Sequence, residues 1–253
     1  MTVHLVIPDQ HAHPNHNNDR ADWLSKLIID LRPDVVINIG DAADMPSLSA
    51  YDKGKRSFHG RTYRADIDAH LEFQDRLWTP IKRRKRKLPF SVFCIGNHEQ
   101  RIEKALDLSP ELTGSIGLGD LNLREWYDTV VPYEGGTPGT TEIDGVRYAH
   151  YFVSGLMGRP IGGEHPGYSI LTKQFTSGTC GHSHLLDICV RTDGAGRKVY
   201  GAHCGVYQDY DADWAGVTNR LWARGVLVKH NVRDGQYDPQ WISLDTIKRE
   251  YAT

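Results

Sequence analysis

The stretch VVINIGDAAD, residues 35–44, decides how this chain folds. Its first five residues form a mostly apolar run with the length of a buried strand, and the Gly-Asp pair that follows ends the run. Residues 3–7 and 90–95 form similar runs, which stop at the polar sequences PDQH and GNHE. Three such runs predict three buried strands that each end at chemically active side chains.

Helical patterns lie between these strands. Apolar residues from Trp23 to Leu31 recur on one helical face, and Pro33 ends that helix. A longer helix is predicted at about residues 66–87, before the third strand. Strands and helices that alternate in this order are typical of a parallel α/β sheet with right-handed crossovers.

The second half of the chain is rich in strand patterns. They lie at residues 146–152, 177–180, 187–191, 198–204, 225–232 and 236–244. The last two flank an Arg-Asp-Gly turn and are expected to form a hairpin. We therefore predict a second, mixed sheet packed on the first. Both sheets belong to one domain, residues 1–253, with an inserted loop and helix at about residues 45–88.

The composition fits a globular enzyme. Of 253 residues, 39% are hydrophobic and 25% are charged, which excludes a disordered or fibrous chain. The formal net charge of -2 gives no general attraction to nucleic acid, so an anionic partner needs a local patch.

No apolar stretch is long enough to cross a bilayer, and the N-terminus lacks a basic signal region. Four cysteines without C-x-x-C spacing predict reduced thiols in a cytoplasmic protein.

Polar residues gather where five of the predicted strands end. They are Asp9, His11, Asp41, Asn97, His150, His182 and His184. Ligands of open α/β sheets bind where the carboxyl ends of the strands meet, so we expect these side chains to converge. A mixture of carboxylate, imidazole and amide groups without thiolate suits Mn, Fe, Zn or Ni. For each residue taken alone, the alternative is a polar cap at a strand end.

The order and composition of these segments resemble the five motifs of the calcineurin-like metallophosphoesterase superfamily. The matching segments are Asp9-Gln10-His11, Gly40-Asp41-Ala42-Ala43-Asp44, Gly96-Asn97-His98-Glu99, His150 and Gly181-His182-Ser183-His184. The resemblance, which is to small bacterial and phage members, implies a four-layer α/β/β/α sandwich of two mixed sheets. It also implies a site for two divalent metal ions, with Mn as the first expectation.

The resemblance further implies which residues hold each metal ion. One ion would be held by Asp9, His11, Asp41 and His184, and the other by Asp41, Asn97, His150 and His182, with Asp41 bridging. A hydroxide formed from water between the ions would attack phosphorus, and His98 would protonate or stabilise the leaving oxygen. Asp44 would orient a metal-binding histidine, and Glu99 would cap the following helix or orient a neighbour.

Three positions depart from common patterns of the superfamily. Met45 stands where serine/threonine protein phosphatases usually carry arginine, and Ala12 stands where they usually carry glycine. Tyr151 replaces the glycine that often follows the fourth-motif histidine. The first two departures argue against a protein phosphatase of that kind, although the Asn-His-Glu form of the third motif occurs there as well.

Two basic segments are candidates for contact with a substrate. The loop at residues 53–64 holds five cations and two aromatic residues, which suits a phosphate backbone and a stacked base. Its candidate contacts are Arg56, Arg61 and Arg64, and the alternative is a solvated loop. Arg101 is a further candidate, with a structural ion pair as its alternative. The run at residues 82–87 is expected to end a helix at the opposite edge of the sheet, as a solvated helix end or a secondary contact with nucleic acid.

These features predict an enzyme, a phosphodiesterase or nuclease that hydrolyses nucleic acid or nucleotide phosphodiesters with two metal ions. The first alternative is a phosphomonoesterase acting on a phosphoprotein or a small metabolite, because it would use the same metal core. The second is a binding module that kept the fold and lost catalysis, against which the intact Asn97 and His98 argue. No membrane partner is expected.

Overall fold

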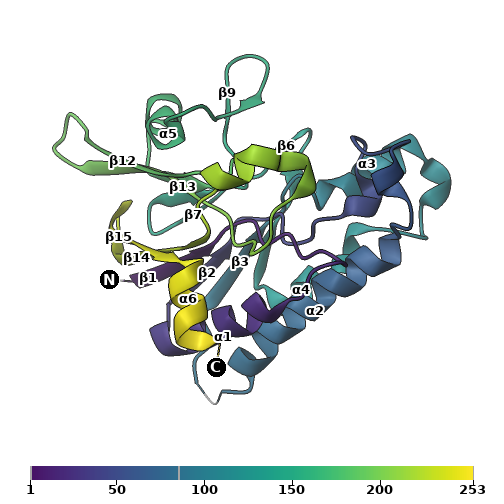
Figure 1. Ribbon diagram of the computed structural model, residues 1–253. Helices are drawn as coiled ribbons and strands as arrows, with labels where there is room; N and C mark the ends of the chain where they lie inside the picture. Colours follow the sequence, from purple (N-terminus) through teal and green to yellow (C-terminus); the bar gives the residue numbers. More distant parts are fainter. Residues whose placement is uncertain (1, 85, 253) are drawn as a thin grey trace.

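A six-stranded mixed sheet forms the centre of the computed structural model, which describes residues 2–84 and 86–252 (Figure 1). Its strands are β1 (Thr2–Ile7), β2 (Val35–Asn38), β3 (Phe90–Cys94), β4 (Thr129–Val131), β14 (Gly225–Arg233) and β15 (Gln236–Ser243). They lie in the order β15-β14-β1-β2-β3-β4. Strands β1 to β4 are parallel, and β14 and β15 join them as an antiparallel hairpin.

A second mixed sheet of five strands packs on the first. Its members are β7 (Thr141–Ile143), β8 (Val146–Tyr148), β11 (Gly178–Cys180), β12 (Leu186–Thr192) and β13 (Lys198–Cys204). They lie in the order β12-β13-β11-β8-β7. The three central strands are parallel, and both edge strands are antiparallel to their neighbours. Two short strand pairs stand apart, β5 (Tyr133–Glu134) with β6 (Thr137–Pro138), and β9 (Val153–Ser154) with β10 (Arg159–Pro160).

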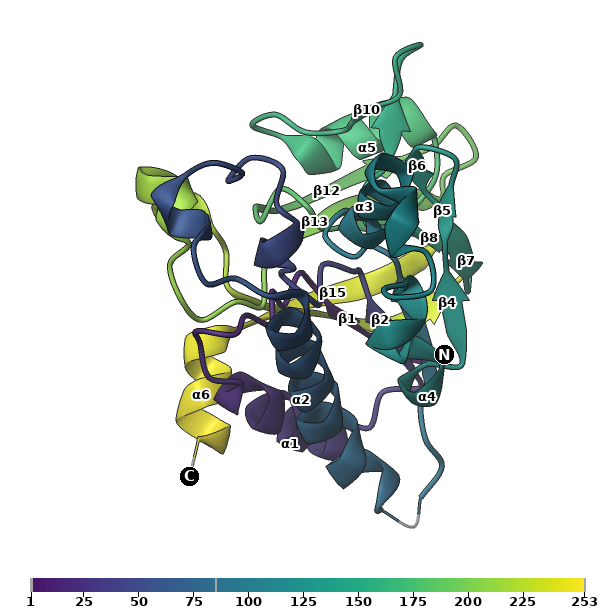
Figure 2. The same ribbon diagram turned by 90° about the vertical axis from the view of Figure 1, so that its right-hand side faces the viewer.

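Helices cover the outer faces of the two sheets. Figure 2 shows α1 (Asp19–Leu31), α2 (Tyr63–Lys82) and α6 (Leu244–Tyr251) below the six-stranded sheet and α5 (Pro166–Gln174) beyond the five-stranded one. The remaining helices are α3 (Gln100–Leu108), α4 (Leu123–Trp126) and the 3-10 turns η1 (Pro46–Leu48), η2 (Arg56–Phe58), η3 (Pro110–Leu112), η4 (Leu118–Leu121) and η5 (Asp213–Leu221). The predicted four-layer α/β/β/α sandwich is confirmed.

The alternation of side chains along the central strands produces these layers. In β1, Leu5 and Ile7 face the core under the helices, whereas Val6 faces the core between the two sheets. Each fully buried aliphatic side chain contributes about 1.5–3 kcal/mol relative to exposure. The period of two thus places apolar groups on both faces of the sheet, and the loops at its carboxyl edge stay available for polar residues.

The inserted helix and the fourth-motif strand differ from their predicted ranges. Helix α2 begins at Tyr63, because Thr62 caps it by accepting the backbone N–H of Ala65, and it ends at Lys82 rather than at residue 87. Pro89 disfavours helix at the residue before it, so the chain is extended before β3. Strand β8 ends at Tyr148 and does not reach residue 152.

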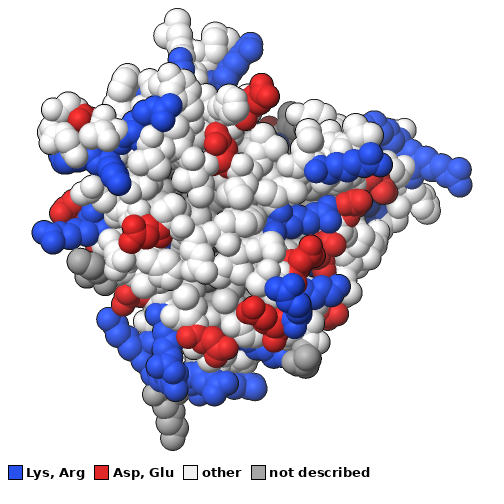
Figure 3. Space-filling view, turned by 60° about the vertical axis from the view of Figure 1, so that its left-hand side comes forward, with Lys and Arg blue, Asp and Glu red and all other residues white. Residues whose placement is uncertain are grey.

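The basic run at residues 82–87 therefore ends a shorter helix than predicted. Lys82 closes α2 and Arg83 caps it, while Arg84, Arg86 and Lys87 lie in the turn before β3; Lys85 lies outside the described residues. Since this turn precedes the amino end of β3, the cations lie at the edge opposite the candidate site, as predicted. Figure 3 shows Lys and Arg side chains gathered at this end of the molecule.

Two expectations from composition can also be compared with the structure. All four cysteines are free, in agreement with the predicted thiols, and Cys94, Cys180 and Cys204 are buried. Among the residues that the structure describes, no helix combines the length and apolar composition that crossing a bilayer requires.

We predict that His70 makes the metal-free protein less stable in acid. Burial lowers the pKa of this α2 side chain to about 4, and its Nε2 lies 3.2 Å from the Leu121 carbonyl oxygen. The unfolded chain takes up a proton near pH 6.5 while the folded chain stays neutral, so the free energy of unfolding falls as pH drops from 6.5 to 4.

The variant His70→Gln should reduce this slope by up to about 1.4 kcal/mol per pH unit, measured by urea unfolding between pH 4 and 7. The exposed His165 is the matched control, because solvent reaches its ring. An unchanged slope in His70→Gln would contradict the prediction.

Candidate metal centre

Loops at the carboxyl ends of five strands bring all seven predicted ligand residues together. Three triads of ligand atoms lie within 4.8 Å of one another: Asp9, His11 and His184; His11, Asp41 and His98; and Asp41, His150 and His182. The side-chain oxygen of Asn97 joins the third group, 2.9 Å from Nε2 of His150. The first sheet supplies both aspartates and the second sheet supplies three of the histidines, so the site lies where the two sheets meet.

One oxygen atom of the first triad lacks a hydrogen-bond partner among the described residues. Nε2 of His184 lies 3.2 Å from Oδ2 of Asp9 and 3.1 Å from Nε2 of His11. Oδ1 of Asp9 is buried and has no hydrogen-bond partner among residues 2–84 and 86–252. Leaving a buried acceptor unpaired costs about 1–3 kcal/mol. Converging imidazole nitrogens beside such an oxygen fit a divalent cation.

The third triad, Asp41, His150 and His182, is oriented by the backbone around it. Nδ1 of His150 lies 3.0 Å from the carbonyl oxygen of Ile39, which directs Nε2 toward Oδ2 of Asp41 at 3.3 Å. A hydrogen bond at one ring nitrogen commonly fixes the other as a metal ligand. Asp41 belongs to two of the triads, so it occupies the position between the two groups that a bridging carboxylate requires.

Four of the candidate ligands have a backbone conformation that side chains rarely adopt. The φ angles are 46° at His11, 49° at Asp41, 71° at His182 and 61° at His184. Each such residue costs on the order of 1 kcal/mol and persists only where the surroundings enforce it. Strain repeated at four convergent residues indicates that their side chains are needed where they lie.

Two glycines make room for the aspartates. A Cβ atom at Gly96 would lie 2.2 Å from Oδ1 of Asp41, and one at Gly181 would lie 2.3 Å from Oδ1 of Asp9. The backbone that follows each glycine also binds the carboxylate, because His98 N donates to Asp41 Oδ1 at 2.8 Å and His182 N donates to Asp9 Oδ2 at 3.0 Å. The main chain of the third motif therefore binds the second motif, and the main chain of the fifth motif binds the first.

Charges inside the site hold the carboxylates ionised. Burial alone would raise the pKa of Asp9 and of Asp41, but nearby histidines outweigh it and hold both values below the usual range. Burial would likewise lower the pKa of His150, yet the charge of Asp41 and a hydrogen bond to it raise that pKa to about 9. In the metal-free protein, protonated His150 therefore neutralises Asp41.

Asp44 and Glu99 support the site from outside. Asp44 Oδ1 lies 3.2 Å from Nδ1 of His11 and 3.1 Å from Nδ1 of His98, so it orients both rings. Glu99 accepts the backbone N–H groups of Asp41 and Ala43 at 2.9 and 3.0 Å and does not cap α3 with its side chain. Of the two roles considered for Glu99, orientation of a neighbour is the one observed.

His98 forms a pair with Arg101, three residues further along the chain. Its Nδ1 lies 2.6 Å from the Asp44 carbonyl oxygen, and its Nε2 accepts a hydrogen bond from the Arg101 guanidinium at 3.0 Å. Burial lowers the pKa of His98, so the ring is neutral with its proton on Nδ1. The i, i+3 spacing was the sequence signal for this contact.

The chain beyond residue 205 covers one side of the site, which the sequence did not predict. Tyr210 donates from its hydroxyl to the carbonyl oxygen of His11 at 2.7 Å, and the ring of Trp222 packs against that of His184 at 4.3 Å. Arg20, fully buried in α1, donates to the carbonyl oxygen of Gln10 at 2.8 Å. A charged residue on an otherwise apolar helix face was the available signal for Arg20.

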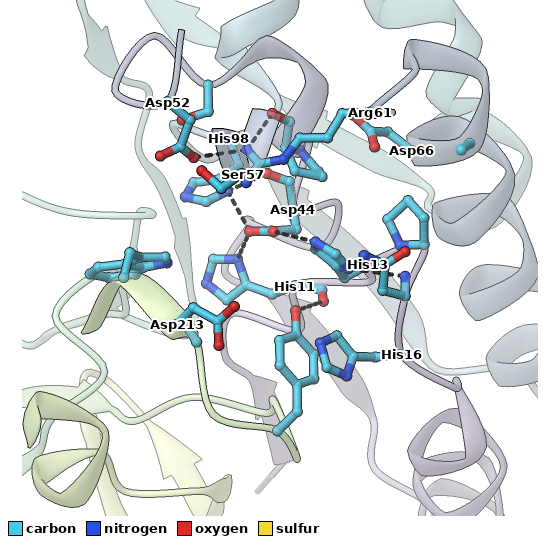
Figure 4. Close-up of a pocket in the computed structure, with 18 of the residues that line it drawn as sticks. His11, His13, His16, Asp44, Asp52, Ser57, Arg61, Asp66, His98 and Asp213 are labelled. Atoms are coloured by element: carbon cyan, nitrogen blue, oxygen red, sulfur yellow. Dashed lines mark hydrogen bonds and ion pairs between the residues drawn. The ribbon is translucent and has the colours of Figure 1, made fainter. Parts of the chain in front are cut away.

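The four candidate substrate arginines are placed differently. A pocket of about 640 Å³ beside the metal centre is lined by Arg61 and Arg101 but not by Arg56 or Arg64 (Figure 4). Arg61 is paired with Asp52 at 2.8 Å. Arg64 is 82% exposed on α2, where it pairs with an aspartate one turn further along. Contact of these arginines with a substrate stays a prediction.

Two solved structures are distantly similar to this chain. No protein-family model and no curated protein matches the chain. A conserved uncharacterised protein of Streptococcus pneumoniae TIGR4, described as a predicted phosphoesterase, is 11% identical with a TM-score of 0.37, covering 96% of this chain and 90% of its own. A protein of Thermus thermophilus is 10% identical with a TM-score of 0.37, covering 95% of this chain and 98% of its own. Likeness at this level carries no information about activity.

We predict that metal binding displaces a proton from His150. Because the pKa of this residue is raised to about 9 in the metal-free protein, a cation must compete with that proton below pH 9. Affinity should therefore increase with pH between 7 and 9, by up to about tenfold per unit for one proton. Calorimetry with Mn at pH 7.5, in two buffers of different ionisation enthalpy, measures the protons released.

The variant His150→Gln removes the titrating group and serves as the comparison for this experiment. It should bind Mn more weakly and release fewer protons than the unmodified protein. An affinity that does not change between pH 7 and pH 9 would contradict the assignment.

Proposed function

We propose that this chain is a metal-dependent phosphoesterase that hydrolyses phosphodiesters, and that nucleotides or nucleic acid are its substrates. The observation that supports the proposal best is the buried cluster of aspartate and histidine side chains. Its backbone is strained, and Oδ1 of Asp9 has no hydrogen-bond partner in the part of the chain that the structure describes. A structural polar network would satisfy its own atoms. A cluster that leaves a buried carboxylate oxygen, Oδ1 of Asp9, without a partner among the described residues suits a cation.

Two groups of residues would hold two divalent ions. They are Asp9, His11, Asp41 and His184 for one ion, and Asp41, Asn97, His150 and His182 for the other. Ligands of oxygen and nitrogen without sulfur favour Mn, Fe, Zn or Ni. When bound, two such ions supply Lewis acidity and lower the pKa of water at neutral pH.

The contribution of the chain itself to the chemistry centres on His98 and Arg101. Both line the pocket beside Asp41, and the Arg101 guanidinium bonds the His98 ring. An ester oxygen that leaves toward this pair receives a hydrogen bond from Arg101, and from His98 once that ring carries a second proton. The carboxylate of Asp44 contacts Nδ1 of His98 and holds the His98 ring in place.

The pocket is large enough for a phosphodiester, whose phosphate carries two organic groups. It has a volume of about 640 Å³ and extends from His11 and His98 to the loop before α2 and to residues near Trp214. A phosphomonoesterase remains the first rival. The second rival is a binding module without catalysis. The placement of His98 and Arg101 next to the triads of ligand atoms does not support it.

We predict that the Mn-loaded protein hydrolyses bis-p-nitrophenyl phosphate with a higher kcat/KM than p-nitrophenyl phosphate. Removal of metal with EDTA should abolish the activity, and added Mn should restore it, because the candidate ligands then regain their cation. The release of p-nitrophenol measures both reactions. Preference for the monoester would contradict the diesterase assignment, and the absence of hydrolysis with Mn, Fe, Zn and Ni would favour the binding module.

We also predict that His98→Gln affects poor leaving groups most. Loss of a group that assists the leaving oxygen should lower kcat by about 100-fold for diphenyl phosphate, and by less for bis-p-nitrophenyl phosphate, since p-nitrophenolate leaves without help. His165→Gln, an exposed histidine far along the chain, is the control. An equal decrease of kcat for both esters would contradict the proposal that His98 assists the leaving oxygen.

A further inference from the structure

Strand β12 lies at one edge of the five-stranded sheet. It pairs with β13 through all seven of its residues, without a register shift. Backbone hydrogen bonds continue this pairing at both ends, from Gly205 N to the Leu185 carbonyl oxygen and from Asp193 N to that of Arg197. In an antiparallel pair such bonds recur at every second residue, so the odd-numbered residues of β12 bond β13. The N–H and C=O groups that face outward belong to Leu186, Ile188, Val190 and Thr192.

The other edges of the two large sheets carry features that oppose further pairing. Strand β15 contains Pro239, which has no N–H donor, and β4 and β7 are only three residues long. Strand β12 has seven residues, and none of them is proline or lysine. One outward carbonyl oxygen, that of Val190, accepts a hydrogen bond from the exposed Arg191 guanidinium at 2.9 Å. The edge of β12 is therefore long, lacks these protective features and accepts donors.

The sequence of β12, LDICVRT, is complementary to itself in antiparallel pairing. When two such strands pair over their full length, Cys189 lies at the centre, opposite Cys189 of the second copy. Asp187 then lies opposite Arg191, and Ile188 lies opposite Val190. A two-fold axis repeats each of these contacts, and opposite charges and aliphatic side chains are favourable cross-strand pairs. In this register the outward-facing residues of one strand also meet those of the other, as backbone hydrogen bonding requires.

Asp187 and Arg191 are available for such a contact. Asp187 accepts the backbone N–H of Gly167 through Oδ2 at 2.8 Å, which leaves its other oxygen for a cation. The Arg191 guanidinium lies over the ring of Tyr168, 5.3 Å from its centroid. In the part of the chain that the structure describes, neither side chain has an oppositely charged partner. Both contacts hold the two side chains on the face of β12 that α5 covers, so the charges of two paired strands would meet on one face.

A groove of about 450 Å³ runs beside this edge. It is lined by His165, Tyr168 and residues 187–191. Figure 1 shows the hairpin of β12 and β13 projecting from the body of the molecule next to α5. Because side chains alternate along a strand, Val190 lies on the opposite face from Asp187, and its apolar side chain is 38% exposed. A second strand along β12 would cover Val190 and bring its own arginine to the groove.

We propose that two copies of this chain pair antiparallel through β12, around a two-fold axis at Cys189, and join their five-stranded sheets into one. A strand of an unrelated protein would also find an open edge here, but the self-complementary order of charges favours a second copy. Stable interfaces bury about 1,200–2,000 Å², and a strand of seven residues supplies a small part of that area. We therefore expect a dimer that dissociates on dilution. The pairing does not depend on the proposed phosphoesterase activity.

Sedimentation velocity of the full-length protein tests the pairing. Between about 1 μM and about 1 mM, the mass should rise from that of the 28.6 kDa chain to twice that value. Arg191→Asp should raise the Kd of the dimer by at least about tenfold, because it places like charges opposite each other at two sites. Arg233→Asp is the matched control, since Arg233 ends β14 and is 75% exposed, and its Kd should not change.

Two further variants locate the contact and its register. Val190→Pro removes an outward N–H that β13 does not use, and it should also raise the Kd by at least about tenfold. Oxidation with diamide should link two copies through Cys189, because residues at such a position have Cα atoms about 4.5 Å apart. Cys189→Ser should abolish the covalent dimer on non-reducing gels, since the other three cysteines are buried. The control adds Thr192→Cys to Cys189→Ser, and it should stay unlinked because residue 192 faces residue 186.

Three outcomes would overturn the inference. The first is a chain that stays monomeric up to about 1 mM. The second is a dimer whose Kd is the same in Arg191→Asp, Val190→Pro and the Arg233→Asp control, because another surface would then hold it together. The third is a covalent dimer that forms equally well in the control with Thr192→Cys, which would exclude the register centred on Cys189. Thermal unfolding of each variant confirms that the comparison is between folded proteins.

Discussion

Two buried carboxylates, those of Asp9 and Asp41, are the constraint on which the rest of the structure depends. They are 0% and 2% exposed, and both stay ionised in the folded protein. An unpaired charge removed from water costs several kcal/mol even after relaxation. The fold meets this cost with backbone N–H groups from the third and fifth motifs and with histidines from the second sheet.

The apolar cores and the carboxyl edge of the sheets have different roles. The cores on both faces of β1 and β2 follow the strict alternation of aliphatic side chains, and they supply the driving force for folding. The edge contains strained residues such as His11 and His184, and an oxygen of Asp9 that no described residue pairs. Backbone strain and an unpaired polar atom both lower the stability of the fold. They occur at the place where a bound ligand would compensate for that lost stability, and such places are expected to be functional sites.

Acidic and basic side chains lie in different places around the site. The cations predicted to contact a phosphate backbone lie outside the pocket, as Arg64 does, or are held by aspartates, as Arg61 is. The basic turn before β3 lies at the far edge of the sheet. The residues that line the pocket include Asp44, Asp66 and Asp213. The counts of charged residues in the sequence could not reveal this, because ion pairs between a loop and its own neighbours form only after folding.

The sequence alone predicted the two sheets and the seven residues that converge, because buried strands show a clear apolar period and their polar ends follow in a specific order. The four layers were implied by the resemblance that the five motifs carry. The predictions misjudged the ends of α2 and β8, since caps and proline effects act over one or two residues. Only the tertiary structure decided that the segment with Tyr210 and Trp222 covers the site. These contacts join residues that no period or motif connects, so packing between distant segments had to bring them together.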